Sequence, residues 1–381
     1  MKLIKVIVLT AFCFVTSVCP EAEGREFVID VPIQKIRRTP VVQVEAGGQK
    51  WNFVVDTGAA WCVGSSAFAA QAFAITNYSS THHVNAVGFS GEVVKLPVVT
   101  IPLLRLAGAP FVNLPLVVSD LSSFSSKNIR VDGLLGFQFF KSYRLTLDYK
   151  SGRIRMTPTN TLNSLNTNTI PFALKEGVPA ITLVIQGRDF TFIVDSGNSG
   201  SLDFPAEQLG LNFVSQPNDG GGVLSIGGVK ANRQGRLAGS VAIGALEFVD
   251  PIVTSMPENR FYVGNMILEH FTVTFDPGSK NIEFAPNQFL PVKLPPIRSW
   301  GLVFGVASNR WVVEAISQDS PELTRAIHLG DRWTRLNGEP ISDWSLTQLG
   351  DLLEQTNVIR SSFIRQDKEF DIDLPVFLIV P

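Results

Sequence analysis

Residues 53–59 read FVVDTGA, an apolar run that ends at Asp56 and is followed by a hydroxyl-bearing residue and a glycine. The apolar run predicts a buried strand, and the Thr-Gly step predicts the turn that ends it. A carboxylate at the end of a buried strand is costly unless it is hydrogen-bonded or paired. Residues 192–197 read FIVDSG and place Asp195 in the same setting. The two stretches together indicate that each carboxylate is the partner of the other.

An internal repeat surrounds these two aspartates. Residues 39–58 align without a gap with residues 178–197, at an offset of 139. Residues 135–158 align in the same way with residues 263–286, at an offset of 128, so the first copy carries 11 more residues between its two blocks. Two blocks repeated in the same order predict a duplicated domain.

The remainder of each copy is predicted to be mostly β. Glycines flanked by apolar residues within 84–101 and 223–241 indicate one hairpin in each copy. Short helices are expected at residues 65–73 and 205–209, soon after each aspartate loop.

The paired aspartates suggest acid–base chemistry. Two carboxylates held a few ångströms apart cannot both ionise easily, so one pKa rises and the pair shares a proton. One carboxylate can then take a proton from water while the other gives one to a carbonyl oxygen, which hydrolyses an amide without a metal or a covalent intermediate. The pair titrates as a unit, so which aspartate is the base stays open. The neighbouring residues suit this task, because hydroxyls can lock the two loops and glycines allow close backbone approach: Thr57, Gly58, Ser196 and Gly197.

The two loops resemble those of the pepsin and retropepsin aspartic peptidases. Each Asp-hydroxyl-Gly loop is followed downstream by an apolar-apolar-Gly step, Leu134-Leu135-Gly136 in one copy and Tyr262-Val263-Gly264 in the other. The resemblance covers about residues 26–290. It implies a mainly β, bilobal fold of two related six-stranded-type β-barrel lobes with a cleft between them. It also implies an aspartic endopeptidase that acts on polypeptide substrates, with Asp56 and Asp195 as the catalytic pair. Both loops lie in one chain, so the catalytic unit is expected to be monomeric.

The same resemblance implies hairpin flaps over the substrate. The first is expected near residues 82–96 and the second near residues 225–229, with these substrate-binding candidates: Gly88, Phe89, Gly227 and Gly228. The first hairpin lacks the tyrosine that pepsin-like enzymes place there, and Phe89 sits near its tip. Two alternatives stay open: a catalytically inactive peptide-binding or adaptor protein of the same fold, and turn aspartates that only cap local N–H groups.

Residues 297–381 are predicted to form a separate domain beyond a linker with four prolines at 286–296. The stretch Gly301-Leu302-Val303-Phe304 resembles the carboxylate-binding loop of PDZ domains, although Val303 replaces the usual second glycine. The resemblance implies binding of C-terminal peptides as an added strand. The alternative is a small α/β domain with ordinary glycine turns.

The N-terminus is predicted to be an export signal over residues 1–24. Lys2 and Lys5 precede an apolar segment, Val6 to Val18, that is short for a membrane span. The expected location is periplasmic or secreted, and membrane attachment, including lipidation of Cys19, stays open. The two lobes are expected at residues 25–158 and 159–290.

Composition narrows the classes of function. The chain has 381 residues, of which 45% are hydrophobic, so it can build a sizeable core. A net charge of -2 makes nucleic acid an unexpected partner. Three cysteines, two of them in or near the signal, allow no disulfide framework, and the four histidines show no metal-ligand spacing. No metal and no cofactor are expected.

Overall fold

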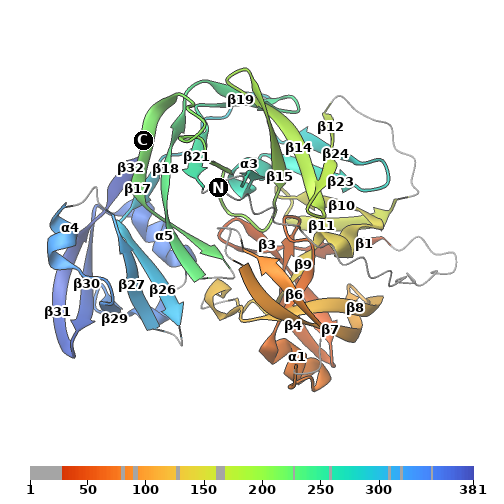
Figure 1. Ribbon diagram of the computed structural model, residues 1–381, viewed down its shortest axis with the longest axis horizontal. Helices are drawn as coiled ribbons and strands as arrows, with labels where there is room; N and C mark the ends of the chain where they lie inside the picture. Colours follow the sequence, from red (N-terminus) through yellow and green to blue (C-terminus); the bar gives the residue numbers. More distant parts are fainter. Residues whose placement is uncertain are drawn as a thin grey trace, which may run out of the picture.

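The protein is mainly β, with a few short helices (Figure 1). The computed structural model describes residues 28–78, 82–88, 93–125, 129–159, 168–225, 228–256, 260–307, 310–317, 321–344 and 346–381. The predicted signal (residues 1–24), Phe89 and Gly227 lie outside these residues. Within them, no helix is long and apolar enough to cross a membrane.

The first copy of the repeat forms an eight-stranded mixed sheet in the order β2-β3-β4-β9-β5-β8-β7-β6. Its central strands are buried on both faces, which explains their continuous apolar runs. The strands are β2 (Gln34–Ile36), β3 (Thr39–Ala46), β4 (Gln49–Asp56), β5 (Cys62–Ser65), β6 (His82–Val87), β7 (Val93–Leu106), β8 (Ala109–Ser119) and β9 (Gly133–Gly136).

The second copy forms a matching eight-stranded sheet in the order β13-β14-β15-β22-β16-β21-β18-β17. A separate hairpin, β19 (Ser240–Ile243) and β20 (Leu246–Val249), lies beside it. The strands of the sheet are β13 (Ala173–Lys175), β14 (Val178–Ile185), β15 (Arg188–Val194), β16 (Leu202–Phe204), β17 (Phe213–Ser225), β18 (Gly228–Leu237), β21 (Ile252–Ser255) and β22 (Tyr262–Val263).

The two sheets share one connection pattern, so the sequence repeat is a structural repeat. In the first, β4 runs parallel to β9, while β5 runs antiparallel to β9 and parallel to β8. In the second, β15 runs parallel to β22, while β16 runs antiparallel to β22 and parallel to β21. Each copy has eight strands in its sheet rather than the six expected, because a hairpin extends one edge (β6–β7 or β17–β18) and a short strand extends the other (β2 or β13).

A six-stranded sheet in the order β1-β11-β10-β23-β24-β12 joins the two copies. At its centre, β10 pairs with β23 so that Thr146 lies opposite Thr274, its equivalent at the offset of 128, with the two Oγ1 atoms 3.0 Å apart. An approximate twofold axis therefore passes between these threonines. The strands are β1 (Ile29–Pro32), β10 (Tyr143–Asp148), β11 (Arg153–Pro158), β12 (Thr169–Pro171), β23 (Phe271–Asp276) and β24 (Asn281–Pro286).

The helices are short. The expected helix after the first aspartate loop is α1 (Ser66–Phe73), which begins where Ser65 Oγ accepts a hydrogen bond from the Phe68 N–H. The prediction of a helix at residues 205–209 is wrong. That segment is a turn with one i→i−4 bond, from the Leu209 N–H to the Pro205 oxygen, and it ends where Gly210 adopts φ +66°. The other short helices of the two copies are η1 (Ser122–Phe124), α2 (Phe137–Phe140) and α3 (Asn265–Leu268).

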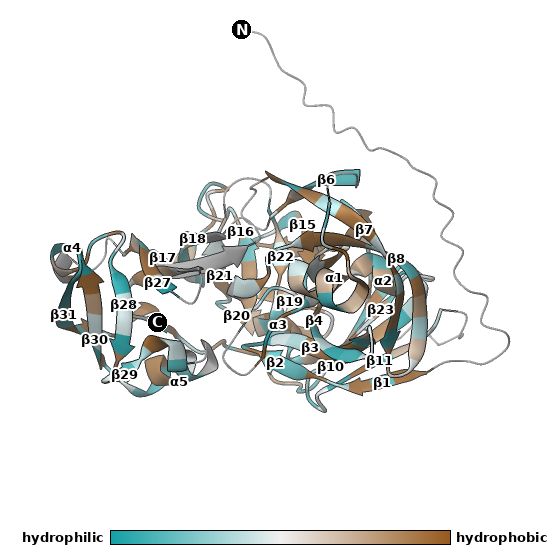
Figure 2. Cartoon of the chain, turned by 90° about the horizontal axis from the view of Figure 1, so that it is seen from below, coloured by the Kyte–Doolittle hydropathy of each residue, from teal (hydrophilic) through white to brown (hydrophobic). Residues whose placement is uncertain are grey.

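The remaining chain forms a third unit to one side of the two copies (Figures 1 and 2). Its sheet has the order β26-β27-β28-β30-β31, with β29 on β28, around a core of stacked aromatic rings that includes Trp333 and Phe363. The elements are β25 (Ile297–Ser299), β26 (Leu302–Ala307), β27 (Arg310–Ile316), α4 (Pro321–Ala326), β28 (Arg332–Leu336), β29 (Glu339–Pro340), η2 (Ile341–Asp343), α5 (Leu346–Gln355), β30 (Val358–Arg365), β31 (Lys368–Pro375) and β32 (Phe377–Val380).

The third unit rests on the long hairpin of the second copy. Strands β17 and β18 lie against β26, β27 and β32, and η1 of the first copy lies against β26. Polar contacts support this placement, because Ser317 Oγ donates to the Asp219 oxygen at 3.1 Å and Asn218 Nδ2 donates to the Ile379 oxygen at 3.1 Å.

Candidate active site

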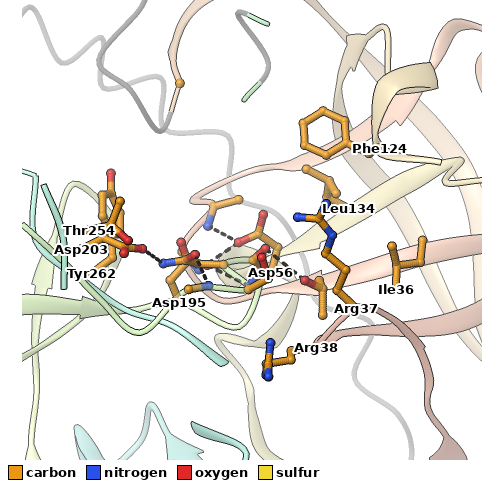
Figure 3. A pocket seen from close by; sticks show the side chains of 18 of the residues that line it. Ile36, Arg37, Arg38, Asp56, Phe124, Leu134, Asp195, Asp203, Thr254 and Tyr262 are labelled. Atoms are coloured by element: carbon orange, nitrogen blue, oxygen red, sulfur yellow. Dashed lines mark hydrogen bonds between the residues drawn. The ribbon is translucent and has the colours of Figure 1, made fainter. Parts of the chain in front are cut away.

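Asp56 and Asp195 lie at the same place in the two copies and face one another (Figure 3). Asp56 ends β4, and Asp195 directly follows β15, each beside the parallel strand that carries the apolar-apolar-Gly step. Both line a cavity of about 1750 Å³ whose walls come from the two copies and the third unit. The structure therefore brings together the two carboxylates that the repeat singled out.

Four crossed hydrogen bonds join the two loops. The Thr57 N–H donates to Ser196 Oγ at 3.0 Å, and the Ser196 N–H donates to Thr57 Oγ1 at 3.0 Å. Each hydroxyl in turn donates across to the opposite strand, Thr57 to the Val194 oxygen and Ser196 to the Val55 oxygen, both at 2.7 Å. Both hydroxyl residues are fully buried, so the bonds are shielded from water.

The two glycines provide the space in which the carboxylates meet. A Cβ added at Gly58 would overlap the Asp195 carboxyl, and a Cβ added at Gly197 would overlap that of Asp56. Each glycine also supplies a backbone donor to the aspartate of its own loop. Asp56 Oδ1 accepts from the N–H groups of Gly58 at 3.1 Å and Ala59 at 2.9 Å, whereas Asp195 Oδ1 accepts from Gly197 at 2.8 Å.

The environments raise the pKa of both carboxyl groups. Burial is the largest cause for each, and the two groups share a hydrogen bond. The pKa of Asp195 is raised further than that of Asp56, because the charge of Asp56 adds to the cost of burial. Asp56 also has one more backbone donor, which favours its anion. The pair is therefore arranged to hold one proton between the two groups.

Two residues behind the loops, Asn265 and Tyr149, were not predicted from the sequence to belong to the site. Asn265 is fully buried and donates from Nδ2 to the Ser196 oxygen at 2.7 Å, and its Oδ1 accepts from the Tyr149 hydroxyl at 2.6 Å. Burial raises the pKa of Tyr149 well above its usual range, which keeps this hydroxyl a donor. The only signal was a polar residue after the second apolar-apolar-Gly step, where the first copy has Phe137.

Asp203 is another buried carboxylate in the cavity wall that the motifs did not reveal. It lies on β16, is 2% exposed and accepts a hydrogen bond from Asn198 Nδ2. Burial raises its pKa to about 6. Its charge also raises the pKa of Asp195, so the two groups are close enough to interact.

The predicted flap residues are placed in part. Gly88 follows β6 and lines the cavity, as do Asn85 and Val87 of that strand. Gly228 begins β18. The hairpins at both predicted positions exist, β6–β7 in the first copy and β17–β18 in the second.

The residues predicted as a carboxylate-binding loop lie at the start of β26. Gly301 precedes it with φ +72°, and its N–H donates to Ser299 Oγ at 2.9 Å. Leu302, Val303 and Phe304 are buried strand residues that line the same cavity as the aspartates.

The structure offers no candidate metal centre in the parts that it describes: no group of three or more His, Cys, Asp or Glu residues there could hold an ion. Cys62 is buried, and burial raises the pKa of its thiol to about 12, so it is not a reactive thiolate.

Comparison with known proteins gives a match around the first of the two loops. The profile of the aspartyl protease family matches residues 42–139, the part of the chain that contains Asp56. A crystal structure of a retropepsin-like aspartic protease from Rickettsia conorii is similar at 15% identity and a TM-score of 0.26, over 35% of this chain and 94% of that chain. The comparison with curated proteins gives no match. Asp195 lies beyond the matched residues and is related to Asp56 by the repeat.

The crossed hydrogen bonds generate a stability prediction. In Thr57→Val the Ser196 N–H loses its acceptor and the Val194 oxygen loses its donor, and each buried group left unpaired costs about 1–3 kcal/mol. We expect the free energy of unfolding, measured in urea, to fall accordingly. Thr57→Ser is the matched control, because it keeps the hydroxyl that the other loop already has, and it should stay close to the wild type. Equal losses in the two variants would contradict the role of the hydroxyl.

Proposed function

We propose that the chain is an aspartic endopeptidase that hydrolyses peptide bonds with a water held between Asp56 and Asp195. The observation that carries this proposal is the pair of carboxylates at equivalent places in the two copies, which face one another in a large cavity (Figure 3) and approach through Gly58 and Gly197. The match of residues 42–139 to the aspartyl protease family supports it independently.

The unequal surroundings of the two carboxylates suggest their roles. Asp56 is the base, because two backbone N–H groups stabilise its anion. Asp195 holds the shared proton, because burial and the neighbouring charge disfavour its anion. The water oxygen bonds to the substrate carbonyl carbon as Asp56 takes a water proton and Asp195 gives its proton to the carbonyl oxygen. When the C–N bond breaks, the leaving amine takes the proton from Asp56, and Asp195 recovers one from the diol hydroxyl. The hairpins β6–β7 and β17–β18 would close over the peptide and exclude water.

The third unit is proposed to act as a PDZ-like module that binds polypeptide, including C-terminal peptides, and leads it to the catalytic pair. Two observations support this. Strand β26 lies at the end of its sheet, where a peptide could add as a further strand. Leu302 and Phe304 of β26 and Leu349 and Leu353 of α5 line the cavity that contains the aspartates.

The proposed cellular location and oligomeric state of the enzyme are those expected from the sequence. We propose export by residues 1–24 to a periplasmic or secreted location, and a catalytic unit that works as a monomer. A monomer is consistent with both loops lying in one chain. Fractionation of cells that express the full chain, with sizing of the purified protein, tests both points.

The catalytic assignment predicts that Asp56→Asn and Asp195→Asn each lower kcat/KM by about 10²–10⁴, because each removes one half of the proton exchange. The measurement is cleavage of a mixed peptide library, read by mass spectrometry. Asp132→Asn is the matched control, since Asp132 is equally buried but pairs with Arg130 away from the cavity. Cleavage retained in both dyad variants would refute the proposal, and peptide binding without cleavage by the wild type would favour the adaptor alternative.

A pH-dependent stability effect follows from the raised pKa of both dyad carboxyls. Their contribution to stability is fully present below the ordinary pKa of 3.8 and is lost as the pH rises through the raised values. We therefore expect Asp195→Asn to melt at a higher temperature than the wild type once the pH exceeds the raised pKa values, because the wild type then carries a second charge that burial disfavours. The difference should shrink as the pH falls through the raised pKa values and should be smallest below the ordinary carboxyl value of 3.8. A constant difference across the range would show that the dyad is not desolvated.

The proposed role of the third unit predicts a substrate-dependent effect. Leu353→Lys places a charge in the part of the cavity formed by α5 and should lower kcat/KM for an unfolded protein substrate about tenfold, the worth of one buried apolar side chain. A hexapeptide too short to reach α5 should be cleaved as by the wild type. Leu378→Lys, at an exposed position on β32 outside the cavity, is the control. Equal effects on both substrates would argue against a docking role.

A further inference from the structure

The repeat allows the two walls beside the catalytic pair to be compared residue by residue. In the first copy, Val63 of β5 pairs with Leu134 of β9 on one side and Val117 of β8 on the other. All three line the cavity, together with Leu96 of β7 and Phe124 of η1. Figure 3 shows Leu134 and Phe124 of this wall. The paired positions of this wall are all apolar, and the charged side chain of Arg37 also lines the cavity beside Leu134 and Phe124 (Figure 3).

The second copy repeats the arrangement with polar residues. Asp203 of β16 pairs with Tyr262 of β22 on one side and Thr254 of β21 on the other, so it occupies the place of Val63. Gln234 of β18 lies opposite Thr254 and donates to its hydroxyl at 3.3 Å. Two residues earlier on the same strand, Asn232 takes the place of Leu96. All five line the cavity, so the internal symmetry relates an apolar wall to a polar one.

The polar wall contains a buried carboxylate that has neutral donors and no countercharge. The Thr254 hydroxyl and the Asn198 amide lower the pKa of Asp203 against the effect of burial, but neither carries a charge. Asp203 Oδ1 and Asn232 Oδ1 are buried and have no hydrogen-bond partner among the described residues. No Lys or Arg of the described chain forms an ion pair with Asp203. Arg260 also lines this part of the cavity, but it donates to the Tyr262 hydroxyl at 3.3 Å and lies 3.8 Å from the Glu176 carboxylate. The charge of Arg260 is therefore paired with Glu176 and not with Asp203.

Access to the carboxylate depends on Gly200. A Cβ at this position would lie 2.7 Å from Asp203 Oδ2 and 3.0 Å from Oδ1. Because residue 200 has no side chain, the carboxylate is not capped on that side. The backbone of Gly200 is not in the left-handed region, so its lack of a side chain is not required by the turn itself.

We propose that the wall around Asp203 is a subsite for a cationic side chain, lysine or arginine, of the polypeptide substrate. The opposite wall around Val63 takes an apolar side chain, so that the scissile bond lies between an apolar and a basic residue. This proposal rests on the proposed function. A substrate ammonium or guanidinium would supply both the missing donors and the missing countercharge, whereas an apolar side chain would leave two buried oxygens unpaired.

Binding of uncleavable peptides tests the subsite separately from catalysis. The probes are hexapeptides with a hydroxyethylene group in place of the scissile amide, leucine on one side of it and either lysine or norleucine on the other, made in both orders. Norleucine keeps most of the lysine stem and lacks the charge. In one of the two orders, we expect the full-length wild type to bind the lysine peptide about ten- to hundredfold more tightly by calorimetry.

Three variants test whether the preference for the lysine peptide depends on Asp203. Asp203→Asn removes the charge, and the ratio of the two dissociation constants should fall to near one. Gly200→Ala keeps the charge of Asp203 but places a methyl group against both of its oxygens, so it should lower the same ratio even if the first variant folds poorly. Asp132→Asn, which removes an equally buried carboxylate outside the cavity, should keep the ratio of the wild type.

The outcomes separate the two proposals when the corresponding amide peptides are also assayed for cleavage. Cleavage without a preference for lysine, or with a preference that Asp203→Asn leaves unchanged, would overturn the subsite and leave the peptidase standing. A lysine preference that depends on Asp203, in a protein that cleaves none of the peptides, would support the subsite and overturn the peptidase. Failure to bind any of the peptides would overturn the subsite.

Discussion

The arrangement of the site depends on the crossed hydrogen bonds between the loops at Thr57 and Ser196. Each hydroxyl accepts from the opposite backbone and donates to the opposite strand, so neither loop can move without unpairing buried groups of the other. Buried groups left unpaired are costly, which makes the two loops a single rigid unit. The carboxylates extend from this unit, and their separation is therefore determined by backbone rather than by flexible side chains.

The rigidity of the two loops holds the carboxyl groups together against electrostatic repulsion. Two carboxyl groups would separate if their surroundings allowed it, because burial and mutual repulsion both disfavour the doubly charged pair. The locked loops, the glycines that admit the opposing carboxyl, and the buried Asn265 behind them resist this separation. The six-stranded sheet adds a second connection, since the halves meet again at Thr146 and Thr274.

Much of this arrangement is predictable from the sequence because the repeat is nearly free of gaps around the loops. Two equivalent Asp-hydroxyl-Gly turns at the ends of buried strands specify both carboxylates and the hydroxyls that lock them. The contact from Tyr149 to Asn265 was not predictable, because it joins residues far apart in the chain. Asp203 was missed because the alignment needs a gap between residues 58 and 135, where its equivalent Val63 lies. The expected helix at 205–209 failed because Gly210 ends the turn before a second helical bond forms.

The fusion of the two copies into one chain has a consequence for how such a cleft can diversify. In an assembly of two identical chains every substitution is made twice, so one added carboxylate would bring a second, facing it across the axis. Here Val63 and Asp203 occupy equivalent positions but are encoded separately. One side of the groove can therefore gain a charge while the equivalent position on the other side stays apolar. A peptide bound between two different sides has a preferred direction, which a perfectly symmetric groove could not impose.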